Sequence, residues 1–133
     1  MKNRILCTLI LLAIVSGFAA ALPNPEFEGS WSMSSGACSG NIDITNVTEK
    51  SFEFLFDGLY LNEITGGANI GGLEGVAVFT SENKAVCVYS CEYQDDVTFE
   101  FVLDNGKLLV SVAEGSELGL FGRGVYMSGE YSK

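Results

Sequence analysis

The chain has 133 residues, of which 47% are hydrophobic, and its 17 acidic and seven basic residues give a formal net charge of −10. A surface with this charge repels nucleic acid and anionic lipid, which disfavours binding to either. The sequence contains no histidine, so Ser–His–Asp and Cys–His catalytic sites are excluded and the commonest protein metal ligand is missing.

The first 22 residues have the pattern of a signal peptide. Lys2 and Arg4 precede a largely apolar run over residues 5–15, and small residues at 19–21 form a site of the kind that signal peptidase accepts. We expect a helical signal peptide, cleavage near Leu22, and a secreted or periplasmic protein. The alternative is an uncleaved anchor, because the apolar stretch approaches the ~17–25 residues that cross a bilayer.

Residues 23–133 are expected to form a single domain, since a chain of this length can bury one self-supporting core. Without Lys2 and Arg4, five basic residues remain against 17 acidic ones, which gives a formal charge of −12. Such a charge keeps a protein soluble, and we expect a monomer that does not contact a membrane after cleavage. The same field attracts a cationic partner.

Alternation of apolar and polar residues predicts strands with one buried face. It occurs at Ile42 and Ile44 and again in residues 51–56, 97–103 and 108–113. Two other segments, 76–80 and 85–89, are more uniformly apolar, and we expect them to be buried on both faces.

Turn residues separate these predicted strands. Residues 104–106 (Asp-Asn-Gly) predict a tight hairpin, because Asn and Gly tolerate positive φ angles. Residues 81–83 predict a second hairpin and residues 57–58 a third. Four glycines in residues 66–72 predict a flexible loop, and residues 114–122 are expected to be irregular.

The chain begins and ends in similar short strand candidates, residues 28–33 and 124–131. Pairing of these two segments would close the sheet and remove its exposed edges. We therefore predict an all-β fold, a small antiparallel β-barrel of about eight strands spanning residues 23–133. The alternative is a two-sheet β-sandwich.

Three cysteines follow the signal peptide. Exported proteins meet oxidising conditions, so we expect one disulfide. On one extended strand Cys87 and Cys91 would lie about 13 Å apart, beyond the ~7 Å that a disulfide bridges. Cys38 is therefore expected to pair with Cys91, or alternatively with Cys87, leaving one free thiol. Three cysteines without histidine do not predict a zinc site.

Candidate chemical groups are sparse. Asp95, Asp96, Asp104 and Asn105 carry the oxygen ligands that Ca²⁺ prefers, but they lack the spacing of a calcium loop and are expected to be solvated. Four glutamates could supply a carboxylate pair for hydrolysis: Glu63, Glu74, Glu114 and Glu117. We predict no catalytic residue, no metal and no cofactor, and the binding residues remain unknown at this stage.

The segment Gly29-Ser30-Trp31 resembles the G-x-W motif that opens the first strand of lipocalins and avidin-like proteins. In lipocalins this tryptophan packs at the closed end of the barrel, near an arginine from the last strand. The resemblance implies a barrel and assigns the arginine position to Arg123.

The C-terminal half resembles a second group. Cys91 precedes the alternating strand at 97–103, followed by a Gly-Lys hairpin and a Gly-Val-x-x-x-Gly-x-Tyr pattern at 124–131. This arrangement is similar to small exported bacterial β-domains that accompany periplasmic lysozyme-inhibitor proteins. The resemblance implies a binding role in the same compartment.

Together these observations predict an exported, acidic, non-enzymatic binding protein that captures a cationic protein such as a lysozyme. One alternative is a small-ligand carrier that uses the barrel interior. The nine phenylalanines favour a filled interior over an open one. A carboxylate-based hydrolase is the remaining alternative.

Overall fold

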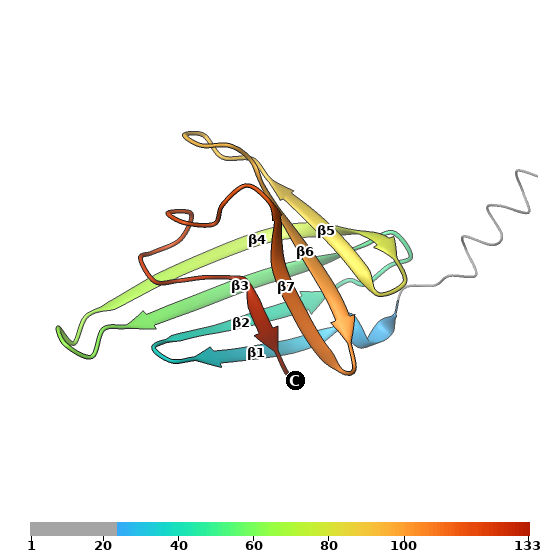
Figure 1. Cartoon of the computed structure of the whole chain (residues 1–133). Coiled ribbons are helices and arrows are strands. Elements are labelled where there is room, and N and C mark those ends of the chain that lie inside the picture. Colours follow the sequence, from blue (N-terminus) through green and yellow to red (C-terminus); the bar gives the residue numbers. More distant parts are fainter. Residues whose placement is uncertain (1–23) are drawn as a thin grey trace, which may run out of the picture.

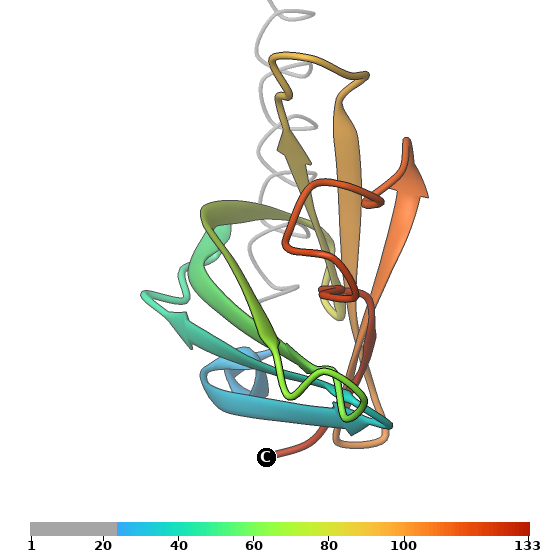
Figure 2. The same cartoon turned by 90° about the vertical axis from the view of Figure 1, so that its left-hand side faces the viewer.

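The computed structural model describes residues 24–133, which form a single antiparallel sheet curled into a barrel (Figures 1 and 2). Eight strands pair in chain order, from β1 to β8. They are β1 (Gly29–Ser35), β2 (Cys38–Thr45), β3 (Ser51–Leu61), β4 (Ala68–Ser81), β5 (Lys84–Tyr89), β6 (Val97–Asp104), β7 (Lys107–Glu114) and β8 (Gly129–Tyr131). The predicted all-β barrel is confirmed, and the β-sandwich is not formed. The predicted signal peptide lies outside the described residues.

A single bridge between the first strand and the end of the chain nearly closes the barrel. Ser32 and Ser132 exchange two backbone hydrogen bonds, with N···O distances of 2.7 and 2.9 Å. The predicted meeting of the two terminal segments is therefore confirmed. The last strand is shorter than predicted, because residues 115–128 form a long loop and only Gly129–Tyr131 pair with β7.

Phenylalanine rings fill the barrel interior, as the alternating pattern predicted. Phe101 of β6 lies 5.5 Å from Phe52 and 5.0 Å from Phe54, both of β3, measured between ring centroids. Burial of these rings removes a large apolar area from water and so contributes strongly to hydrophobic stabilisation. The phenylalanines that are fully or almost fully buried are Phe27, Phe52, Phe54, Phe56, Phe99 and Phe101.

A short 3-10 helix, η1 (Pro25–Phe27), covers one end of the barrel, which we call the closed end. Phe27 stacks on Phe52 with ring centroids 5.3 Å apart, and its carbonyl accepts a hydrogen bond of 2.9 Å from the buried Trp31 Nε1. Lys133 Nζ lies 4.8 Å from the Trp31 ring centroid, within the range of a cation–π interaction. The Trp31 side chain is thus held from both sides.

The expectation that Arg123 packs near Trp31 is wrong. Arg123 belongs to the loop before β8 and lies at the opposite end of the barrel, the mouth, where the β1–β2 and β3–β4 connections also lie. The chain runs back to the closed end only through β8. The first basic residue to reach Trp31 is therefore Lys133, two residues beyond that strand.

The loop of residues 115–128, the β7–β8 loop, crosses the mouth (Figure 1). It inserts buried Val125 and Met127 and places Phe121 5.2 Å from Phe56, between ring centroids. Gly71, predicted to lie in a flexible loop, is instead part of β4. A Cβ atom there would lie 2.7 Å from the Cβ of Phe121, so glycine allows the loop to approach the strand.

The predicted turns are confirmed at two of three positions. Asn105 and Gly106 adopt φ angles of +50° and +76° in the β6–β7 hairpin, and residues 82–83 connect β4 to β5. Residues 57–58 do not turn: they continue β3, and the reversal occurs at residues 62–67. There Asn62 Oδ1 accepts hydrogen bonds from the backbone nitrogens of Ile64 and Thr65, at 3.0 and 3.2 Å. This side chain stabilises the turn that was expected at residues 57–58.

The apolar segments 76–80 and 85–89 are buried on one face only, contrary to expectation. Val76, Val78 and Val88 point outward and are 50%, 53% and 60% exposed. No second layer covers this side of the sheet in the part of the chain that is described. Within the same residues, no helix is long and apolar enough to cross a bilayer.

The Phe101→Ala substitution is expected to lower the free energy of unfolding by about 3–5 kcal/mol, because it opens a cavity among fully buried rings. Urea denaturation measures this change. The matched control is Val88→Ala on the outer face, with an expected loss below ~1 kcal/mol. Similar losses for both variants would contradict the assignment of Phe101 to the core.

Candidate functional site

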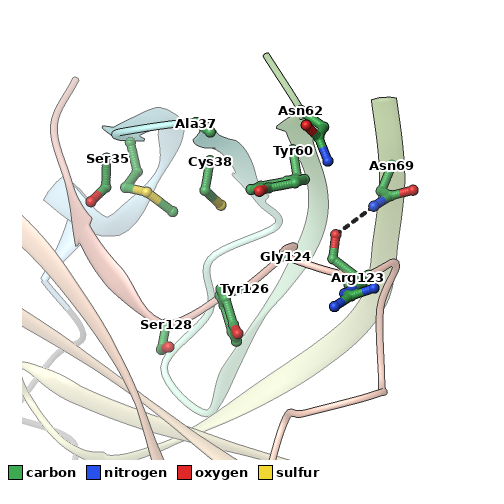
Figure 3. A pocket seen from close by; sticks show the side chains of 11 residues that line it. Ser35, Ala37, Cys38, Tyr60, Asn62, Asn69, Arg123, Gly124, Tyr126 and Ser128 are labelled. Atoms are coloured by element: carbon green, nitrogen blue, oxygen red, sulfur yellow. Dashed lines mark hydrogen bonds between the residues drawn. The ribbon is translucent and has the colours of Figure 1, made fainter. Parts of the chain in front are cut away.

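A pocket of about 730 Å³ lies at the mouth, between β1–β4 and the β7–β8 loop. Cys38, Tyr60 and Asn62 lie on one side, and Arg123 and Tyr126 lie on the other (Figure 3). Its volume is in the range of small-molecule sites. The lining residues of this mouth pocket are Met33, Ser35, Ala37, Cys38, Tyr60, Asn62, Asn69, Arg123, Gly124, Tyr126 and Ser128.

Contacts between strand and loop fix the shape of the mouth pocket. Asn69 Nδ2 donates a hydrogen bond of 2.7 Å to the Arg123 carbonyl oxygen. Gly124 adopts a φ of +82° and lies flat on the Tyr60 ring, where a Cβ atom would come within 2.6 Å of ring carbons. Both contacts place the backbone that carries Arg123 at the edge of the pocket.

Below the pocket, Glu117 anchors the β7–β8 loop. Its Oε1 atom accepts hydrogen bonds from the Ser128 backbone nitrogen at 3.3 Å and from Ser128 Oγ at 2.8 Å. Its side chain is buried, and Oε2 has no hydrogen-bond partner. Beside it, Tyr131 donates a 2.6 Å hydrogen bond from its hydroxyl to the Met127 carbonyl oxygen. The Glu117 bonds join the two ends of the β7–β8 loop to each other, and the Tyr131 bond holds the C-terminal end of the loop on β8.

A second hollow, which we call the outer groove, lies on the outside of β2, β3 and β4 and has a volume of about 450 Å³. Register places Asp43, Leu55 and Glu74 side by side across the three strands, and Glu53 beside Val76. Leu55 and Val76 are 43% and 50% exposed. The groove therefore combines three carboxylates with two accessible apolar side chains.

Hydrogen bonds orient two of these carboxylates. Asp43 Oδ1 accepts from Ser30 Oγ at 2.5 Å and from Asn41 Nδ2 at 3.2 Å. Glu53 accepts from the Asn46 side-chain amide. No lysine or arginine occurs in β2, β3 or β4, so these strands carry no cation that could neutralise the groove.

The acidic residues considered for calcium or hydrolysis are not brought together. Asp95 and Asp96 lie in the β5–β6 loop and Asp104 lies in the β6–β7 hairpin, at opposite ends of a strand that spans roughly 20 Å. Within residues 24–133, no group of three or more His, Cys, Asp or Glu residues forms a metal-binding cluster.

The four candidate glutamates are also dispersed. Glu63 is exposed in the β3–β4 connection, Glu74 projects from the outside of β4, and Glu114 is exposed at the end of β7. Glu117 alone is buried. None of the four lines the mouth pocket, so the geometry does not support a carboxylate pair there.

The expected disulfide between Cys38 and Cys91, or Cys38 and Cys87, is absent from the described residues, where all three cysteines are free. The sheet order separates β2 from β5 by two strands. Cys38 lines the mouth pocket, and Cys91 lies in the β5–β6 loop. Cys87 is buried in the interior, close to Gly75 and Phe54.

Sequence reasoning did not identify the mouth pocket. Its residues come from β1, β2, β3, β4 and the β7–β8 loop, which are distant in the chain. One feature of the sequence pointed to it: Arg123 is the only arginine after Arg4. No family model, curated protein or solved structure matches this chain. The two resemblances noted above therefore remain predictions from the sequence.

Thiol labelling tests the arrangement of the cysteines. Burial raises the pKa of the Cys87 thiol, which lowers its reactive thiolate fraction. In the folded protein, iodoacetamide at pH 8 is expected to modify Cys38 and Cys91 first, and Cys87 only after unfolding, as measured by peptide mass spectrometry. A linked Cys38–Cys91 or Cys38–Cys87 peptide would contradict the structure.

Alkaline unfolding tests the anchoring of the loop. Burial, reinforced by Cys38 and Glu117, raises the pKa of Tyr131 above its usual value near 10. A raised folded-state pKa means that the contribution of Tyr131 to stability is complete below pH ~10 and is lost as the pH rises above it. Tyr131→Phe is expected to cost about 1 kcal/mol at pH 8. The substitution should also make the free energy of unfolding, measured by urea denaturation, fall less steeply between pH 10 and 11. An unchanged slope would contradict this role of Tyr131.

Proposed function

We propose that this protein is an exported, acidic, non-enzymatic binding protein that captures a cationic protein on its outer groove. The observation that carries the proposal is the set of three carboxylates, Asp43, Glu53 and Glu74, around exposed Leu55 and Val76. Lysine or arginine side chains of a partner would pair with the carboxylates while the apolar side chains lose contact with water.

Charge supports a cationic partner over a neutral one. The strands that form the groove contain no basic residue, and the formal charge of residues 23–133 is −12. A field of this sign accelerates encounter with a basic protein, and the effect weakens as salt shortens the Debye length to about 8 Å at physiological ionic strength. The same field disfavours nucleic acid.

The exposed apolar side chains supply the second part of the argument. Val78 follows Val76 on the same outer face of β4 and pairs with Val86 of β5, and Val76 and Val78 are 50% and 53% exposed. Contiguous apolar side chains with a polar rim are typical of protein-binding surfaces. The acidic residues then determine which partners are favoured, and the apolar residues add affinity.

A lysozyme is the partner to test first. The resemblance of the C-terminal half to domains that accompany lysozyme-inhibitor proteins suggests this class, and a lysozyme is a basic protein found in the compartments to which a signal peptide would deliver this chain. We include export in the proposal and expect a monomer in solution.

The structure offers less support for the alternatives. A carrier that binds a ligand inside the barrel needs interior space, and Phe52, Phe56, Phe99 and Phe101 occupy it. A hydrolase needs convergent carboxylates, and the candidate glutamates are dispersed.

The test is the affinity for lysozyme, measured by isothermal titration calorimetry at low and physiological salt. The triple variant Asp43→Asn, Glu53→Gln and Glu74→Gln is expected to bind at least about tenfold more weakly than the unmodified protein, because each carboxylate loses a charged partner. Binding by the unmodified protein should weaken as salt increases.

A matched control removes the same number of charges elsewhere: Glu63→Gln, Glu92→Gln and Asp95→Asn, all on exposed loops. This control is expected to change the affinity less than about threefold, since only long-range attraction is reduced. Equal losses for both triple variants would overturn the assignment to the outer groove. Failure to bind lysozyme and other basic proteins at low salt would overturn the proposed function.

A further inference from the structure

The mouth pocket differs from the rest of the protein in charge. The chain has 17 acidic residues, yet none of them lines this pocket. Its charged lining residue is Arg123, one of only five basic residues after Arg4. A hollow that excludes carboxylates and contains a guanidinium group is selective for a negatively charged ligand.

Several of the remaining polar groups can donate hydrogen bonds. Asn62 uses its Oδ1 atom to accept from the backbone of its own turn, which leaves its NH₂ group available to the pocket. The hydroxyls of Tyr60 and Tyr126 and of Ser35 add further donors. A carboxylate or phosphate, which only accepts hydrogen bonds, matches such a set.

The walls of the pocket also include apolar surface. Ala37 of the β1–β2 hairpin and the ring of Tyr60 lie on the side opposite Arg123 and Tyr126 (Figure 3), and Met33 of β1 also lines the pocket. This arrangement suits a ligand that has a flat hydrocarbon body and an anionic group at one end. A simple inorganic anion would leave most of the 730 Å³ unfilled.

The site is built before any ligand arrives. Asn69 holds the Arg123 carbonyl at 2.7 Å, and Gly124 packs on the Tyr60 ring. At the other end of the loop, Glu117 holds Ser128 through two hydrogen bonds. Little backbone conformational entropy remains to be lost on binding, which favours affinity.

We infer that the mouth pocket binds a small organic anion, with Arg123 on its charged group and Met33, Ala37 and Tyr60 against its apolar body. This ligand site lies outside the phenylalanine-filled interior and apart from the outer groove. It is therefore independent of the proposed capture of a cationic protein, and either site can fail its test without affecting the other.

The test compares three probes by ¹⁵N-NMR titration: 2-naphthoate, its uncharged analogue 2-naphthamide, and inorganic phosphate. In the unmodified protein, 2-naphthoate is expected to shift the backbone amide signals of Ala37, Tyr60, Gly124 and Tyr126. It is expected to bind at least about tenfold more tightly than either other probe, since a charge-assisted hydrogen bond is worth about one order of magnitude or more.

Two variants with the same loss of charge locate the effect. Arg123→Gln is expected to remove the preference for 2-naphthoate over 2-naphthamide, because the exposed guanidinium is lost without disturbing the core. Lys84→Gln, at the β4–β5 hairpin of the closed end, is expected to retain the preference for 2-naphthoate over 2-naphthamide. Unchanged amide dispersion confirms that both variants fold.

Three results would overturn the inference: no shift of the pocket amides at millimolar 2-naphthoate, a preference that survives Arg123→Gln, or phosphate binding as tight as 2-naphthoate. The last result would mean that the apolar walls contribute nothing. Shifts confined to Leu55, Val76 and Val88 would place the probe on the outer face and would also overturn it.

Discussion

The structure depends on the packing of phenylalanine rings from β3 against those from β6. Successive side chains of a strand point to opposite faces, so a β3 that places Phe52, Phe54 and Phe56 inside must place Glu53 and Leu55 outside. A shift of one residue in pairing would reverse both faces at once. Core and outer groove are therefore two consequences of one register, and the groove cannot be formed without the core.

Filling the interior has a consequence for function. A barrel whose axis is occupied by rings offers space only on its outside and at its ends. The closed end is covered by η1 and Trp31, and the mouth is partly covered by the β7–β8 loop. At the mouth, space is left between this loop and the strands. Gly71 and Gly124 shape that space, because they allow the loop and the strands to come into close contact. The same loop carries Arg123 to the pocket.

The two candidate sites have opposite charge preferences. Carboxylates line the outer groove, whereas the mouth pocket is lined by an arginine and by no acidic residue. Attraction of a basic protein acts over the Debye length, whereas selection of a small anion depends on direct contact with Arg123. The overall negative field slows the approach of an anion, so a ligand of the pocket needs the apolar contacts as well as the charge.

The sequence by itself determined most of the strands, the buried faces of the alternating segments and two hairpins, because alternation and turn chemistry are local properties of the chain. The meeting of the chain ends was predicted from the similarity of the two terminal segments. Tertiary structure decided the rest. Val76 and Val78 are exposed because no segment of residues 24–133 packs on them. Cys38 and Cys87 lie on strands that β3 and β4 separate, and Lys133 takes the place expected for Arg123 because Arg123 lies in the loop at the mouth, before β8. The mouth pocket likewise depends on contacts between distant segments, such as Asn69 with Arg123, which are 54 residues apart, and Tyr60 with Gly124. Local patterns carry no information about which distant segments meet.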